Sequence, residues 1–431
     1  MNTKTKPTPS YLLASARQAL GRFHTSPAFA GSMLFLAALV LNAALQGPAS
    51  FFTVKNINTL FTKNTPFMLA AIAQSLLLMT GTMDISCGVQ MALVNVVVIM
   101  TGQEWGIPFP LSCLLGIGAA ILASLLCWVC CSVLRLPALL ASYALTFVIK
   151  GVNVMIMSVP QGKVEKLYYK AYDSQIFGFI PASILGLALV LLIWAYVRRT
   201  RLGTHMYAVG GNQRDAFAAG ISPMGVQLKA FLLKGFIIGA AGVCLTLMTA
   251  AGNPLQAEDY GIRSLSACII GGLSFGGWGT VGCAISGAGF LVLIQNSVYY
   301  FFSMLVKMIP GFSVTSYYQN FASDLLILLG LLMTMVTARG QREALRRDIV
   351  RQLKTGIGLR DQAGTPPPDG AAAGAALAPP PGNGTGPENT DAPAFDTLSA
   401  PAVSTSAART GLSDGAGVGA AHTKEGMDDE R

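Results

Sequence analysis

The sequence predicts an all-α fold, a polytopic bundle of transmembrane helices, and two observations carry this prediction. Of the 431 residues, 52% are apolar and only 11% are charged, whereas soluble domains carry about 25% charged residues. Apolar runs follow one another along most of the chain and are joined by short polar segments. A soluble enzyme, a disordered chain and a fibrous protein are therefore disfavoured, because a soluble chain of this length needs charge to cover its surface.

Ten apolar segments are expected to cross the membrane as helices. They lie near residues 28–45, 66–80, 88–100, 109–134, 137–157, 176–197, 228–250, 262–275, 281–302 and 322–336. The segment at 262–275 is too short to cross about 30 Å of hydrocarbon as an ideal helix. We therefore expect about ten spans, with broken or re-entrant stretches among them.

Clusters of basic residues orient the predicted bundle. They lie in residues 1–28, in the loop at 198–214 and in residues 339–360. Even numbers of apolar segments separate these clusters, so all three can lie on the cytoplasmic side, as the positive-inside rule requires. Both termini are then cytoplasmic, and the lysines of the loop at 158–175 are the exception on the outer side. Membrane topology accounts for the basic excess, so no nucleic-acid partner is expected.

Composition divides the chain into four parts. Residues 1–27 form a cytoplasmic segment without a recognisable cleavage site, so the first span is expected to stay as an anchor. The transmembrane domain covers 28–338, and 339–360 is expected to be a basic juxtamembrane helix on anionic headgroups. The Ala/Gly/Pro-rich acidic tail at 361–431 cannot bury a core and should be disordered.

Metal or catalytic chemistry has little support in the sequence. All eight cysteines lie in apolar stretches, and the CxxCC cluster at 127–131 has no histidine nearby. The three histidines are far apart in the chain. Packing thiols are the simpler interpretation, and neither a metal site nor a catalytic residue is expected.

The first informative break is GTMDISCG, from Gly81 to Gly88, between two apolar segments. Asp84 is placed to cap the helix that begins near Cys87 by accepting its free amides. Ser86 lies in the same turn. Two interpretations stay open: a cap at the membrane interface, or a broken helix that lines a solute path.

The second break is GGNQRDAFAAGIS, from Gly210 to Ser222, in the loop on the cytoplasmic side. Asn212 is a possible helix start and Gly220 its stop. The short helix between them is rich in alanine, whereas a solvated loop helix is normally more polar. It can dock into a groove of another protein or pack against its own bundle, and the first is favoured.

The third break is IIGGLSFGGWGTVG, from Ile269 to Gly282, whose six glycines permit close helix approach and a sharp reversal. Several amides also lie in apolar segments, where they make interhelical hydrogen bonds or face a polar solute. The candidate residues of a translocation path are Asp84, Ser86, Gln74, Asn95, Asn153, Gly271, Gly272, Ser274 and Asn296.

At these breaks the sequence resembles the permease subunits of bacterial ABC importers, in the ribose/xylose/arabinose branch. The early motif GGIDLSVGSVMAL of that family is similar to GTMDISCGVQMAL at residues 81–93. The loop motif GRYLYAIGGNPEAARLSGI resembles LGTHMYAVGGNQRDAFAAGI at 202–221. IAAVVIGGTSLSGGRGTV is similar to LSACIIGGLSFGGWGTV at 265–281, and SYWQQVVKGLIILL to SYYQNFASDLLILL at 316–329.

The resemblance implies a transport subunit of the bacterial inner membrane without an ATPase site of its own. It implies a second permease subunit, two cytosolic ATPase subunits that bind ATP and Mg, and an extracytoplasmic solute-binding protein. By this resemblance a small polar solute of the sugar class would pass through the bundle. The coupling helix to the ATPase would contain Gly210, Gly211, Asn212, Arg214, Asp215, Ala216 and Gly220.

The chain departs from the family pattern at a few positions, and two alternatives follow. Arg214 stands where the family carries an acid, Trp278 replaces the usual arginine of the glycine-rich turn, and Gly261 and Arg263 replace acids. Permeases for nucleosides or branched-chain amino acids are the nearest alternative, although they normally carry asparagine at the position of Asp84. A secondary transporter is the more distant one, because no relay of acidic residues or histidines is visible.

Overall fold

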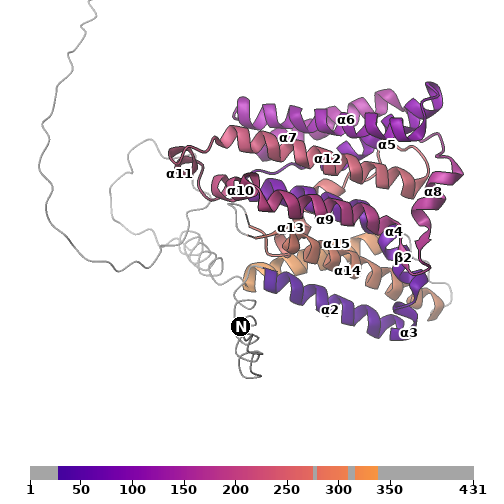
Figure 1. Ribbon diagram of the computed structural model, residues 1–431. Helices are drawn as coiled ribbons and strands as arrows, with labels where there is room; N and C mark the ends of the chain where they lie inside the picture. The colour runs from indigo at the N-terminus through magenta and orange to yellow at the C-terminus, as the bar shows by residue number, and fades with distance from the viewer. Residues whose placement is uncertain (1–27, 275–278, 309–315, 338–431) are drawn as a thin grey trace, which may run out of the picture. The chain divides into compact units, whose positions relative to one another are not determined.

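The computed structural model describes residues 28–274, 279–308 and 316–337, and every structural statement below concerns these residues (Figure 1). The three terminal parts expected at 1–27, 339–360 and 361–431 lie outside the described residues. So does the centre of the glycine-rich turn, including Trp278.

Helices make up nearly all of the described chain. In order they are α2 (Ala28–Gln46), α3 (Pro48–Phe51), α4 (Val54–Met79), α5 (Cys87–Glu104), α6 (Phe109–Trp128), the π-helix η1 (Val129–Val133), α7 (Ala138–Ile156), α8 (Lys166–Asp173), α9 (Ser183–Arg199), α10 (Arg201–Gly211), α11 (Gln213–Ala218), α12 (Pro223–Thr249), α13 (Tyr260–Ile270), α14 (Val281–Met308) and α15 (Ser316–Thr337). Two-residue strands β1 (Gln175–Ile176) and β2 (Ile180–Pro181) pair antiparallel between α8 and α9.

The chain is a helical membrane protein, as the composition predicted. Within the described ranges six helices are long and apolar enough to cross a membrane: α2, α5, α6 with η1, α7, α12 and α14. The pair α9 and α10, bent by 78°, makes a seventh if it is one span. Each of the ten predicted apolar segments contains a helix. The count of ten crossings itself stays a prediction, because several of these helices are short or partly polar.

Helix α4 lies at the centre of the bundle. Its second half, from Pro66 to Met79, is buried almost throughout, and α12 packs along it. The sequence prediction began this helix at residue 66, whereas the structure begins it at Val54. The first half carries Lys55 and Lys63 and buries only polar side chains, so apolarity alone could not reveal that the same helix continues through Pro66.

The bundle has two distinct ends, which Figure 1 shows clearly. Helices α10 and α11 lie at one end, and α3, α8 and β2 lie at the other. Helix α12 begins beside α11 and runs to the opposite end, where Thr249 closes it. We call the first the α11 end and the second the α8 end.

After α12 the chain returns into the bundle without forming a helix. Asn95 of α5 holds this segment, because its Nδ2 donates to the Ala251 carbonyl at 3.1 Å and its Oδ1 accepts from the Asn253 amide at 2.8 Å. Helix α13 starts only at Tyr260 and has 11 residues, which is about 16 Å of rise. The eighth apolar segment, predicted at 262–275, corresponds to α13, and together with residues 250–259 this helix forms a discontinuous element. Residues 250–259 are its irregular limb and α13 is its short helix.

Glycines let these backbones approach one another closely. A Cβ on Gly88 would collide with the Ala257 carbonyl oxygen, and one on Gly261 with the Ile85 carbonyl oxygen. A Cβ on Gly287 of α14 would likewise collide with a backbone oxygen of α13. The irregular limb and α13 are thus pressed against α5 and α14 through positions where only glycine fits.

An ion pair lies in the interior at the break between α4 and α5. The Nζ of Lys234, near the middle of α12, is 2.6 Å from Asp84 Oδ2, and both side chains are fully buried. The expectation that Asp84 caps α5 is wrong. Its Oδ1 accepts from the amide and hydroxyl of Ser86, the N-cap residue, which makes no side-chain cap itself.

Two neutral side chains complete the hydrogen bonding of this pair. Gln90 donates from Nε2 to Asp84 Oδ2 at 3.1 Å, and its Oε1 accepts from Lys234 at 2.6 Å. Ser124 of α6 lies 3.2 Å from the same ammonium. A buried ion pair offsets the cost of its desolvation only when the remaining hydrogen-bond donors and acceptors of both groups have partners. Here those partners form a network that joins the α4–α5 break, α5, α6 and α12.

We predict that Lys234→Met destabilises the protein by about 3–5 kcal/mol, because it leaves the carboxylate of Asp84 buried without its cation. The double variant Asp84→Asn with Lys234→Met should recover much of this loss, since both charges are then removed. Chemical unfolding of the purified protein in mixed micelles measures both. Equal stability of Lys234→Met and the parent would contradict the prediction.

We predict that Gly287→Ala lowers stability, although alanine is the better helix former. Its Cβ collides with the backbone of α13, and overpacking of this kind costs about 1–3 kcal/mol or more. Gly118→Ala in α6 is the matched control, because its Cβ would have no neighbour within 4 Å. The thermal midpoint in detergent should fall for the first variant and hold or rise for the second; the reverse order would refute the close packing of α13 on α14.

Candidate functional site

Helix α11 is the short helix that the sequence predicted in the loop at 210–222. Asn212 is its N-cap, and the Asn212 side chain accepts hydrogen bonds from the amides of Arg214, at 3.0 Å, and Asp215, at 3.4 Å. Asn212 Nδ2 in turn donates to the Asp215 carboxylate at 2.8 Å. The helix ends before Gly220, which has a φ of +82°, a conformation that favours glycine. Both predicted boundaries are confirmed.

Most of α11 is not packed against its own bundle. Ala216 is buried at 4% exposure, whereas Phe217 beside it is 71% exposed. Arg214 and Asp215 are exposed as well. A single small side chain therefore anchors the helix, and its other side chains, including one aromatic ring, are exposed. The helix itself lies at the α11 end of the bundle (Figure 1).

The α11 region lies close to the break between α4 and α5. Gly81, with a φ of +77°, lies against Gly210 near the C-terminus of α10, and a Cβ on Gly81 would sit 3.7 Å from the Gly210 carbonyl oxygen. Asp84 follows three residues later and binds Lys234. The C-terminal end of α10 therefore lies close to the turn that holds the buried ion pair.

The polar candidates of the translocation path in the first half of the chain are all buried. Asn95 fixes the irregular limb, and Asn153 of α7 donates to the carbonyls of Val89, at 3.1 Å, and Pro254, at 3.5 Å. Gln74 accepts from the Cys87 thiol at 3.3 Å. Asp84 and Ser86 belong to the ion-pair network. Their hydrogen bonds place them at helix junctions, and their role in the path stays a prediction.

The remaining path candidates lie in α13, α14 and the turn that joins them. Asn296 donates to Asn42 of α2 at 2.9 Å, an interhelical hydrogen bond. A Cβ on Gly271 would collide with the backbone of α14, and Gly272 has a φ of +95°. Ser274 is half-buried at the edge of the described turn. For these residues too, a contact with solute stays a prediction.

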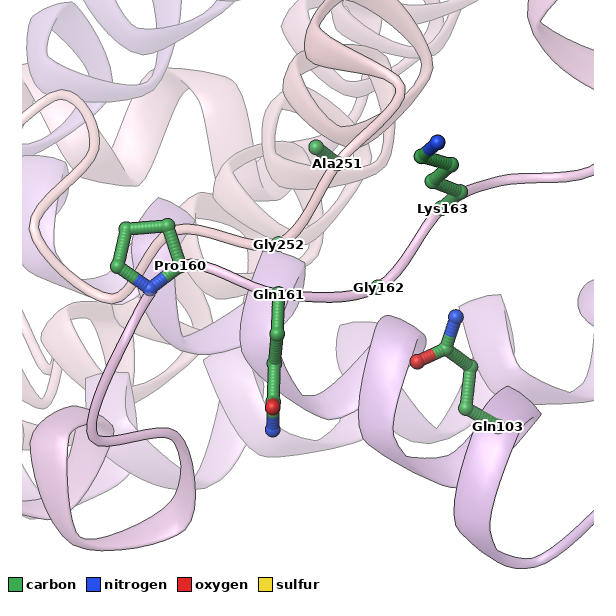
Figure 2. Close-up of a pocket in the computed structure, with 7 residues that line it drawn as sticks. All are labelled: Gln103, Pro160, Gln161, Gly162, Lys163, Ala251 and Gly252. Atoms are coloured by element: carbon green, nitrogen blue, oxygen red, sulfur yellow. The ribbon is translucent and has the colours of Figure 1, made fainter.

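Two pockets lie at the α8 end, and neither contains a predicted path residue. One, of about 490 Å³, is lined by Gln103, Pro160, Gln161, Gly162, Lys163, Ala251 and Gly252. Figure 2 shows the segments at 160–163 and 251–252 running side by side there, and the Gln161 and Gly252 backbones exchange two hydrogen bonds of 3.1 Å. The second, of about 420 Å³, borders α8. Burial raises the pKa of the Tyr172 phenol in its lining, so the phenol stays protonated and donates to the Thr62 carbonyl at 3.0 Å.

Sequence reasoning missed two residues of this arrangement. Lys234 is one of two lysines in a 27-residue apolar helix, and only its partner, 150 residues away in the sequence, distinguishes it from Lys229. Phe217 lies in the predicted Ala-rich loop helix. A helix of six residues has fewer than two turns, so its apolar pattern cannot repeat and cannot show which side chains face outward.

Comparison with known proteins places the chain in a family. A model of the family described as the permease component of the branched-chain amino acid transport system matches residues 56–337. The chain is 25% identical to the ribose import permease protein of Escherichia coli over 317 residues. This alignment covers 70% of this chain and 92% of that protein. It is 27% identical over 354 residues to the L-arabinose ABC transporter permease protein of Azospirillum brasilense, covering 80% and 97% of the two chains.

A third relative is the D-allose transport system permease protein of Escherichia coli, 26% identical over 283 residues, with 62% of this chain and 83% of that protein covered. No solved structure matches the chain. The matched region runs from α4 to the end of α15 and includes α11, the discontinuous element and the ion pair. The protein therefore belongs to the family of membrane permease components that this model describes.

Proposed function

We propose that the chain is the transmembrane permease subunit of a binding-protein-dependent ABC importer and forms the translocation path for a monosaccharide. The family match supports the transport role. The names of the three relatives, which refer to ribose, L-arabinose and D-allose, support a sugar as the solute. The chain itself supplies no ATPase site in this proposal, and separate subunits bind ATP and Mg.

The observation that carries the proposal is the exposure of α11. An exposed aromatic ring on a capped helix at one end of a membrane bundle is the kind of anchor that inserts into a pocket of a partner protein. In the proposed assembly two cytosolic ATPase subunits receive α11 from each of two permease subunits. An extracytoplasmic binding protein delivers the solute at the α8 end.

The contact between Gly81 and Gly210 gives this assembly a route for coupling. Closure of the ATPase subunits on ATP would move α11 and α10 together, since α11 follows α10 after Asn212 alone. The movement would press on the α4–α5 break through the two glycines. It would then reach α12 and α6 through the network of Asp84, Lys234 and Ser124. The cavity between the permease subunits would alternate its opening as these helices shift.

The same proposed assembly implies a membrane topology. With α11 in the cytosol, Arg198 and Arg199 at the end of α9 are cytoplasmic too, as the positive-inside rule requires. Ten crossings then place both termini in the cytoplasm of a bacterium, with the chain as a multi-pass protein of its inner membrane. In this count the discontinuous element of residues 250–270 is one crossing.

The main alternative concerns the class of solute and leaves the proposed subunit assembly unchanged. The family description names branched-chain amino acids, so a permease for these or for nucleosides would use the same α11 and the same partners. A secondary transporter is the less favoured alternative, because it leaves the exposed face of α11 without a function.

We predict that the chain copurified with its ATPase and binding-protein partners in nanodiscs hydrolyses ATP, and that the binding protein loaded with one pentose or hexose stimulates this activity. The chain alone should hydrolyse none. Stimulation by leucine or by a nucleoside instead would keep the mechanism and replace the solute class. Uptake driven by a proton or sodium gradient without any ATPase subunit would refute the proposal.

We predict that Phe217→Ala lowers the amount of ATPase subunit that copurifies with the chain by about tenfold or more, as loss of an aromatic anchor does. The fold should be unaffected, since the ring is 71% exposed. Phe179→Ala is the matched control, because that ring is 60% exposed next to β2 at the opposite end. Equal ATPase recovery with the parent and Phe217→Ala would contradict docking through α11.

A further inference from the structure

Five polar side chains form two hydrogen-bonded groups on the discontinuous element and the helices beside it. Lys150 Nζ of α7 is 2.9 Å from Glu258 Oε2. Asp259 Oδ2 is 3.0 Å from Arg263 NH1, and NH2 of the same guanidinium donates to Gln295 Oε1 of α14 at 2.7 Å. We call these five residues the charge line.

The charge line lies inside the helical bundle, midway along α14 and nearer to the C-terminal end of α7. Gln295 is the fifteenth of the 28 residues of α14, so about 20 Å of helix extends on either side of it. Lys150 lies about 18 Å from the N-terminal end of α7, a helix that is about 28 Å long. At this depth a helix that faces outward meets the hydrocarbon of the bilayer.

The side chains of the charge line are nevertheless partly exposed. Asp259 is 58% exposed, and Lys150 and Glu258 are 37% and 36% exposed. Charged groups at this depth are found facing a protein interior or a water-filled cavity, since contact with lipid is too costly. The irregular backbone of residues 250–259 obeys the same rule, because non-helical backbone at membrane depth occurs only inside protein or beside water.

Two buried polar atoms beside the charge line have no hydrogen-bond partner among the described residues. They are Oδ1 of Asn153, one turn after Lys150 on α7, and Nε of Arg263. Such atoms are normally satisfied by protein or by water. Together with the exposed carboxylates they indicate that polar molecules reach this part of the bundle.

We propose that the charge line is the wall of the solute path at mid-membrane and that it binds a neutral polyhydroxylated solute. The proposal rests on the transport function given above and extends it to residues that were not among the candidates for the path. The carboxylates of Glu258 and Asp259 accept from solute hydroxyls, and Lys150 and Arg263 donate to solute oxygens.

The pairing of the charges favours a polyol over an ionic solute. Two acids and two bases already neutralise one another, so an amino acid or another ion must break a pair in order to bind. Each carboxylate uses one oxygen for its cation and keeps further lone pairs for hydroxyl donors. A sugar therefore adds to the existing contacts, whereas a zwitterion competes with them.

Cysteine accessibility tests whether the charge line faces water. Asp259→Cys and Leu189→Cys are compared in the full-length protein in nanodiscs, with a membrane-impermeant thiosulfonate as reagent and the parent protein as background for its native cysteines. Leu189 is the matched control, because it is 58% exposed in the middle of α9. Asp259→Cys should label well above background, Leu189→Cys should not, and added monosaccharide should slow the first reaction.

Uptake tests the contact with solute. In the reconstituted importer Glu258→Gln and Asp259→Asn should each lower monosaccharide uptake by about tenfold, the loss expected for one hydrogen bond to a charged group. Leu189→Cys should keep it. Undiminished uptake by both carboxamide variants, in complexes recovered in equal amount, would overturn the contact with solute.

The two tests separate this proposal from the proposed function. Labelling at position 259 no faster than at position 189 would show that lipid or a second copy of the chain seals this face, and would overturn the water-filled path. Protection by leucine but not by a sugar would overturn the solute class. A parent complex without ATP-driven uptake would refute the importer, while the labelling contrast, which needs no ATPase subunit, would still report on the path.

Discussion

The buried ion pair of Asp84 and Lys234 is the contact on which the interior of this protein depends. It joins a turn between two helices to the middle of a third, and it does so where neither charge reaches water. Because an unpaired charge is far more costly there than a paired one, the α4–α5 break has little freedom to move independently of α12. Gln90 and Ser124 extend this constraint to α5 and α6.

Glycine supplies the second constraint, which is steric. Backbones of α5, α13 and α14 approach so closely that a methyl group on Gly88, Gly261 or Gly287 has no space. This packing lets an irregular limb return into the bundle with its polar backbone held by Asn95 and the neighbouring carbonyls. Outward-facing charges of the limb then lie at a depth where a continuous helix would present apolar side chains to lipid.

In the proposed assembly these two constraints give a partner at one end a route to the interior. Helix α11 has a single buried anchor, so it can move with whatever protein covers its exposed face. In the proposed assembly its movement would reach the α4–α5 break beside Gly81, and the ion pair would connect that break to α12. A flexible or solvated turn at the same place would absorb the movement, whereas a turn held by a fully buried salt bridge transmits it.

The sequence by itself determined the membrane class, the helix in each apolar segment, the family and both boundaries of α11. Apolarity and capping act between residues close along the chain, so Asn212 and Gly220 could be assigned without a structure. The tertiary structure decided the partners of Asp84 and Lys150, which lie 150 and 108 residues away, and corrected the expected role of Asp84 as a helix cap. It also decided that α4 begins at Val54 and that residues 250–270 are a broken element. These features depend on which helices touch, and the spacing of residues along one chain carries no information about such contacts.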